Sequence, residues 1–180
     1  DPKGWLFIQQ NNKFRFFGAT GSEPGAAWNL IDKDATGQGD YRFTLGADNT
    51  ARVFDAGGTQ LCALVTDRTG NSDHSLWIFK CDHKSSSYGQ FRLYSMKLGL
   101  DDGTELRDFV PCRNPDGVAG LYDQVEGKFY NNKGAGAFLG SDDAQGLYLN
   151  YIAGTGTQWI NTGVSTSGGD TTLDLRFGHV

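Results

Sequence analysis

Four oxygen-bearing side chains have the spacing of ligands in a calcium-binding loop. They are Asp32, Asp34, Thr36 and Asp40, at the first, third, fifth and ninth places of one run. In an EF-hand loop oxygen ligands take these places, and a glycine at the sixth place, here Gly37, permits the sharp turn. The twelfth place holds Phe43 instead of the bidentate glutamate of an EF-hand. Two interpretations of this run are therefore open, a weak calcium site and a plain acidic loop, and we favour the acidic loop. We expect no other cofactor.

Carboxylates and histidines are the remaining groups that could catalyse a reaction. Sandwich enzymes that cut glycans hold two carboxylates at a set separation, which requires same-face spacing on a strand. The closest pairs are Asp170 with Asp174 and Asp101 with Asp102, and neither gives an i, i+2 series on a strand. The histidines lie in polar or terminal stretches, as His74, His83 and His179. No Ser/His/Asp arrangement is legible either, so we predict that the chain is not an enzyme.

Tryptophans are candidate sugar-binding residues, because glycan sites combine exposed aromatic side chains with a few polar groups. Trp5, Trp77 and Trp159 fall in apolar or alternating runs, which favours packing in the core. Trp28 falls in the long polar stretch 18–40. Trp28 is therefore the candidate ligand-binding residue for a glycan.

The three cysteines do not have the spacing of a metal site. Cys62 and Cys81 flank an expected hairpin, and a disulfide between them requires neighbouring strands. Small buried hydrophobic residues are the commoner role for such cysteines. With Cys112 the count is odd, so at least one thiol has no disulfide partner in the chain.

Charge and composition exclude several classes of partner. The net charge is −5 and the pI about 5.0, which argues against binding to nucleic acid or to an acidic membrane surface. No apolar run approaches the ~18 residues that cross a bilayer, so we expect no membrane insertion. The sequence begins at Asp1 without a signal peptide. We therefore expect a processed protein that is secreted or held at the cell surface, the alternative being an edited chain.

Short alternating runs separated by Gly, Asn and Asp predict an all-β protein. The expected strands are 5–8, 13–17, 41–45, 51–54, 60–65, 76–79, 90–98, 105–110, 118–122, 128–130, 151–164 and 171–177. About 10–13 strands in one domain of this size, 1–180, predict a two-sheet antiparallel β-sandwich. Two details are testable. Strand 90–98 should place Phe91, Leu93, Ser95 and Lys97 on one face, and Pro111 should end strand 105–110 because proline cannot donate to a ladder.

Three segments form a block that resembles the closing strands of a known family. They are QFRLYSMKL (90–98), LRDFVPCRN (106–114) and GLYDQVEGKFYNN (120–132). The block is similar to bacterial concanavalin-like, laminin-G-like modules, which are jelly-roll sandwiches of large surface and secreted proteins. The strand that opens those modules resembles YIAGTGTQWINTG (151–163). The resemblance therefore implies a circularly permuted order, which joining Val180 to Asp1 would restore.

The permuted order leaves two hypotheses about how the sandwich is completed. In the first, residues 147–180 complete a neighbouring subunit, and the chain forms a head-to-tail homopolymer, an extracellular filament. The interface residues would be Tyr151, Ile152, Gln158, Trp159, Ile160, Thr162, Val164, Leu173, Leu175 and Phe177. In the second, the same strands fold back onto their own chain, giving a monomeric adhesion module for a glycan or a matrix protein. The connector 138–151 is long enough for either arrangement.

Overall fold

The computed structural model describes residues 5–10, 13–18, 33–34, 39–65, 75–80, 88–143, 146, 148–165 and 170–179. The protein is all-β, every strand pair is antiparallel, and none of the described residues is helical. The strands are β1 (Trp5–Gln10), β2 (Lys13–Gly18), β3 (Lys33–Asp34), β4 (Asp40–Leu45), β5 (Thr50–Asp55), β6 (Gln60–Val65), β7 (Ser75–Ile78), β8 (Phe91–Leu100), β9 (Glu105–Arg113), β10 (Ala119–Asp123), β11 (Lys128–Tyr130), β12 (Leu139–Asp142), β13 (Leu149–Ala153), β14 (Ile160–Ser165) and β15 (Thr171–His179).

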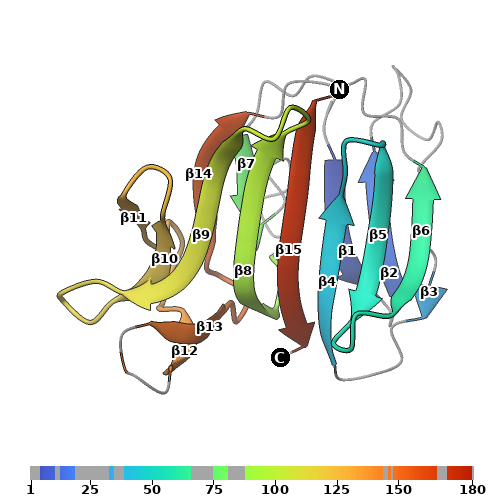
Figure 1. Cartoon of the computed structure of the whole chain (residues 1–180). Helices are drawn as coiled ribbons and strands as arrows, with labels where there is room; N and C mark the ends of the chain where they lie inside the picture. The colour runs from blue at the N-terminus through green and yellow to red at the C-terminus, as the bar shows by residue number, and fades with distance from the viewer. Residues whose placement is uncertain are drawn as a thin grey trace.

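A ten-stranded sheet forms the larger layer (Figure 1). Its strands follow the order β11-β10-β9-β8-β15-β4-β5-β6, and β13 joins it through β8 with β12 paired to β13. The smaller layer consists of the three-stranded sheet β1-β2-β3 and the pair β14-β7. In Figure 1, β1 and β2 lie behind β4 and β5, while β7 and β14 lie behind β8 and β9. The antiparallel two-layer sandwich expected from the sequence is confirmed, whereas the jelly-roll connectivity stays a prediction.

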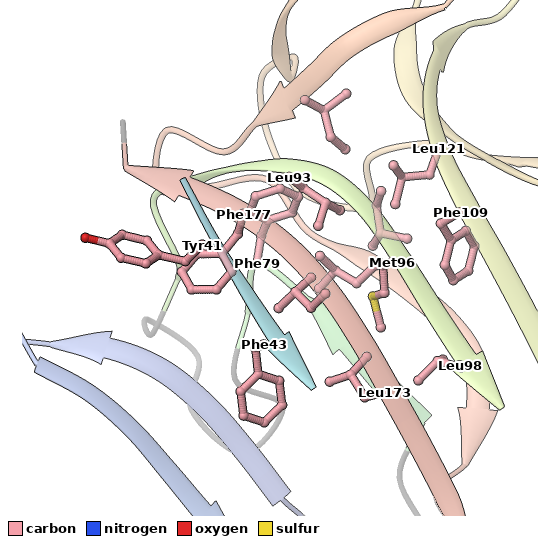
Figure 2. Packing of buried hydrophobic residues seen from close by; sticks show 14 of the residues in the cluster. Tyr41, Phe43, Phe79, Leu93, Met96, Leu98, Phe109, Leu121, Leu173 and Phe177 are labelled. Carbon is pink, nitrogen blue, oxygen red and sulfur yellow. The ribbon is translucent and has the colours of Figure 1, made fainter. Parts of the chain in front are cut away.

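The core lies between the layers and follows from side-chain alternation along the strands. In β4, Tyr41, Phe43 and Leu45 point inward between polar residues, and β15 does the same with alternate apolar residues. Ile78 and Ile160 bring the smaller pair β7–β14 into the same cluster. Figure 2 shows residues of the large sheet converging on this cluster. Each large apolar side chain buried there contributes on the order of 1.5–3 kcal/mol to stability.

The expected face of strand 90–98 is wrong beyond Leu93, because β8 contains a bulge. Leu93 pairs with Phe177 and Ser95 pairs with Arg176, so Tyr94 is an extra residue on the β8 side. The extra residue shifts the alternation by one place. Met96 and Leu98, instead of Ser95 and Lys97, therefore point into the core.

Pro111 does not end β9, which continues to Arg113. Pro111 pairs with Leu121 of β10. Three residues further along the chain, the N–H of Asn114 donates to the carbonyl of Val118, so that pair is a hydrogen-bonded one. Because bonded and non-bonded pairs alternate in an antiparallel ladder, the nitrogen of Pro111 faces away from β10. On the other side, the ladder with β8 stops at Phe109. The missing N–H of the proline therefore costs no ladder bond in this sheet.

Fifteen strands lie in the described residues, more than the sequence indicated. The expected single strand 151–164 is two strands, β13 and β14, which belong to different sheets. The short strands β3 and β12 fall in stretches that contain glycine and aspartate and that were expected to be loops. A turn at 154–159, described below, separates β13 from β14.

Candidate functional site

The candidate interface is the C-terminal segment, residues 147–180, and its strands have an unusual pattern of partners. We call residues 1–146 the body. β13 pairs with β12 and β8, β14 pairs with β7, and β15 pairs with β8 and β4. Within the described residues, no two of these three strands pair with each other. Each strand of the C-terminal segment therefore depends on the body for its sheet hydrogen bonds.

β15 occupies the centre of the large sheet (Figure 1). It pairs with β8 from Thr171 to His179 and with β4 from Leu173 to Gly178. Along this path β15 is the strand that connects β4, β5 and β6 to β8 and the strands beyond it. Removing β15 would therefore split the sheet in two.

The two faces of β15 differ in chemistry. Leu173, Leu175 and Phe177 are buried on the inner face. On the outer face Arg42 Nε donates to Asp174 Oδ1 at 2.9 Å, and the guanidinium also reaches Oδ2. Both side chains of this ion pair are substantially exposed, so the pair adds little stability. Between the side chains of the two faces, those of the inner face therefore contribute more to stability than this ion pair.

β13 places Leu149 and Ile152 in the core and Tyr151 on the outer face. Ile152 is fully buried and pairs with Leu93 of β8 and with Gly140 of β12. The ring of Tyr151 lies on the outer face, with the guanidinium carbon of Arg92 5.1 Å from its centroid. Tyr94 meets the same ring edge-on, at 6.0 Å between centroids. β13 is thus fixed by contacts on both faces.

The turn between β13 and β14 is organised around a buried amide. The Gln158 side chain is only 3% exposed, and its Oε1 accepts hydrogen bonds from the backbone N–H groups of Thr155 (2.8 Å) and Thr157 (3.3 Å). Its Nε2 donates to the carbonyl of Ala137 at 3.1 Å. A Cβ at Gly134 would lie 1.9 Å from the carbonyl oxygen of Thr157, so only glycine allows this close approach. The loop 132–137 of the body is therefore shaped to receive this turn.

β14 is attached to β7 by a side-chain hydroxyl in addition to its short ladder of backbone hydrogen bonds. Ile160, Thr162 and Val164 point inward, and Thr162 is fully buried. The ladder with β7 is irregular between Asn161 and Ser165, and here Thr162 Oγ1 donates to the carbonyl of Leu76 at 2.9 Å. The buried hydroxyl of Thr162 thus has a hydrogen-bond acceptor.

Arg107 connects β14 to the β10–β11 hairpin. Its Nε donates to the carbonyl oxygen of Thr162 at 3.4 Å. The same Nε lies 3.3 Å from Oδ2 of the fully buried Asp123, which is close enough for an ion pair but does not have the geometry of a hydrogen bond. Its Nη2 lies 2.5 Å from Glu126, whose other oxygen accepts a 2.5 Å bond from Tyr130. Burial, and then the bond to Glu126, raises the pKa of Tyr130 to about 12. The bond from Tyr130, and then the charge of Arg107, lowers the pKa of Glu126.

A tryptophan–lysine cluster lies at the junction of the C-terminal segment and the body. It consists of Trp77, Lys80, Tyr88 and Trp159. The indole centroids of Trp77 and Trp159 are 4.3 Å apart, with 31° between the ring planes. Lys80 Nζ lies 5.0 Å from each indole centroid and 5.4 Å from the Tyr88 centroid. All four side chains are half-buried, so the expected core packing of Trp77 and Trp159 is wrong.

Alternation contains the signal that could have located this cluster. Ile78 and Ile160 point into the core. Because neighbouring residues on a strand face opposite ways, Trp77 of β7 must point outward. Trp159 directly precedes β14 and packs on Trp77, so it lies on the same side. Hydrophobicity alone does not distinguish the outward tryptophans from the inward isoleucines.

The remaining sequence candidates are only partly covered by the structure. Trp28, Asp32 and Thr36 lie outside the described residues, as does Cys81 of the candidate disulfide. Asp34 lies in β3, opposite Lys13. Asp40 begins β4, where its Oδ1 accepts a 2.7 Å hydrogen bond from the hydroxyl of Tyr94. In the part of the chain that is described, no group of three or more His, Cys, Asp or Glu side chains is placed to hold a metal ion.

Comparisons with family models, with curated proteins and with solved structures found no match to this chain. Among the described residues there is no helix of the length and apolar character that crosses a membrane.

Proposed function

We propose that the chain is a non-enzymatic structural subunit of an extracellular filament, in which the C-terminal segment of one subunit completes the sandwich of the next. The observation that carries the proposal is the pairing of β13, β14 and β15 with the body alone. A segment without a sheet of its own behaves as an added set of strands.

The position of β15 supports exchange between chains. Its partners β4 and β8 are distant in sequence, and its neighbour in sequence, β14, does not pair with it in the described residues. A second chain could therefore supply β15 to the same place with the same hydrogen bonds and the same buried side chains. Because exchange preserves these contacts, its free-energy cost is small.

Repeated exchange gives a defined assembly. The surface that donates β13–β15 differs from the surface of the body that receives them, so each contact is heterologous. Heterologous contacts that do not close into a ring produce an open filament. The buried residues of the segment, Ile152, Ile160, Leu173, Leu175 and Phe177, would then form the core of every subunit junction.

The alternative is that the same strands complete their own chain, giving a monomeric binding module for a glycan or a matrix protein. The specific observation in its favour is that β15 of a single chain pairs with β4 and β8 of that chain. In both cases the resemblance to laminin-G-like modules remains a proposal about ancestry.

Electron microscopy and size-exclusion chromatography of the full-length chain test the filament. Filaments, or assemblies whose size grows with protein concentration, are the expected result. An excess of the body fragment, residues 1–146, should cap and shorten them, whereas a fragment ending before β8 should not. A full-length chain that stays monomeric at every concentration would rule out the filament and leave the binding module.

A further inference from the structure

The tryptophan–lysine cluster has the composition of a ligand site. Trp77 and Trp159 give two adjoining aromatic surfaces that are half-buried, and the Lys80 ammonium group is held beside both. Aromatic surfaces beside a few placed polar groups are the usual make-up of binding sites for small molecules and sugars. A purely structural pair of indoles would not require a cation over both rings.

The rings are held in place before any ligand arrives. The Trp159 backbone N–H donates to Asn132 Oδ1 at 3.0 Å, and its carbonyl accepts from the Lys133 N–H at 2.9 Å. Trp77 Nε1 lies 3.3 Å from Ser75 Oγ, to which it donates. A preorganised site loses less conformational entropy on binding.

Lys80 gives the cluster a positive charge, although the net charge of the whole chain is −5. Within the described residues, neither Lys80 nor the neighbouring Lys133 forms an ion pair. The described ring contacts of Lys80 use its charge, but a ring is not an oxygen acceptor for its three N–H donors. A carboxylate would supply that acceptor through a charge-assisted hydrogen bond.

We propose that the cluster binds a carboxylate-bearing sugar, such as the uronic acid units of an acidic glycan. The apolar C–H face of a pyranose would lie on the indole of Trp77 or Trp159, and the carboxylate would accept from Lys80. A neutral sugar could stack on the indole but has no carboxylate for Lys80. A simple anion could accept from Lys80 but has no apolar face to stack on an indole. The two contacts together therefore select an acidic sugar.

The site is composite, because Trp77, Lys80 and Tyr88 belong to the body and Trp159 belongs to the C-terminal segment. It forms wherever the segment is docked on a body. The inference therefore holds whether the segment comes from the same chain or from a neighbour, and it does not depend on the filament.

Calorimetric titration of the full-length chain tests the site. Tetragalacturonate is the probe, and a neutral galactose tetramer of the same length is the control ligand. The tetragalacturonate should bind and the neutral tetramer should bind at least tenfold more weakly. Lys80→Met, which keeps the apolar stem, should weaken tetragalacturonate binding by about tenfold or more, as expected for one charge-assisted bond. Trp77→Phe should weaken it less, by reducing the stacked area.

Lys128→Met is the matched control. Lys128 Nζ also lies 5.0 Å from an aromatic ring, that of Tyr130, but outside the cluster. The control should bind tetragalacturonate as the parent does, and thermal melting should show each variant folded. Equal affinity for the neutral tetramer, an equal loss in Lys128→Met, or no binding of tetragalacturonate at about 10 mM would each overturn the proposal.

Discussion

The hydroxyl of Thr162 donates a 2.9 Å hydrogen bond to the backbone carbonyl of Leu76. It bridges β14 to β7 at the point where their ladder is irregular, and the Thr162 side chain is fully buried. The C-terminal segment is therefore attached to the body by a polar contact that water cannot replace. Contacts of this kind fix the register of a docked strand, whereas apolar burial mainly fixes its affinity.

Thr162→Val tests this contact, because valine keeps the shape and removes the hydroxyl. The variant should lose about 1–3 kcal/mol of unfolding free energy, since the carbonyl of Leu76 loses its donor and the buried N–H of Val164 loses its acceptor. Urea unfolding measures the loss. Thr157→Val is the control, because the Thr157 hydroxyl bonds to the carbonyl of Ala135 at an exposed site. Equal losses in the two variants would contradict the account.

Neighbouring residues of β15 should differ sharply in their effect on stability. Leu175→Ala should cost about 2–5 kcal/mol, because it opens a cavity in the core between the layers. Asp174→Ala removes only the exposed ion pair with Arg42 and should cost about 0–1 kcal/mol. Denaturant unfolding of both variants under one set of conditions makes the comparison. A larger loss in the aspartate variant would contradict the division of β15 into a stabilising inner face and a weakly contributing outer face.

The stability of the β10–β11 hairpin should decline in alkali. The pKa of Tyr130 rises from 10.0 to about 12 in the folded chain, so the unfolded chain loses this proton first. Stability from this group is complete below pH 10 and is lost as the pH rises towards 12. Thermal melting from pH 9 to 12 should show this fall, with a shallower slope in Tyr130→Phe. The exposed Tyr122→Phe is the control, and an unchanged slope in Tyr130→Phe would refute the assignment.

Local alternation predicted much of this fold but none of its long-range register. The inward residues of β4 and β15 follow directly from their sequences. The bulge at Tyr94 does not, because the pairing of β8 with Phe177, far along the chain, sets it. The place of Pro111 within β9 likewise depends on where the β8 ladder stops.

The same limit applies to the candidate site. The sequence predicts that the apolar residues of the C-terminal segment are interface residues, and that stays a prediction; the structure shows Ile152, Ile160 and Leu173 buried in the core of a single chain. The division of 151–164 into two strands was missed, because it depends on the contact of Gln158 with Ala137. The tryptophan–lysine cluster was missed because its members come from three separate stretches of sequence.

The measurement that tests strand exchange most directly is a disulfide between β15 and β4. Arg176 and Arg42 are paired across these strands on the outer face. Cysteines at both positions should oxidise to a disulfide wherever β15 is docked, because paired residues on adjacent strands lie close enough to bridge. The background would be Cys62→Ser, Cys81→Ser and Cys112→Ala, so that no other thiol reacts.

Non-reducing electrophoresis of the oxidised Arg42→Cys, Arg176→Cys chain then reports which molecule supplied β15. Exchange between subunits predicts a ladder of covalently linked chains that collapses to one band on reduction, while each single-cysteine variant gives at most a dimer. A single band at the mass of one chain, with its cysteines fully oxidised, would show that every chain completes its own sheet and would contradict the filament.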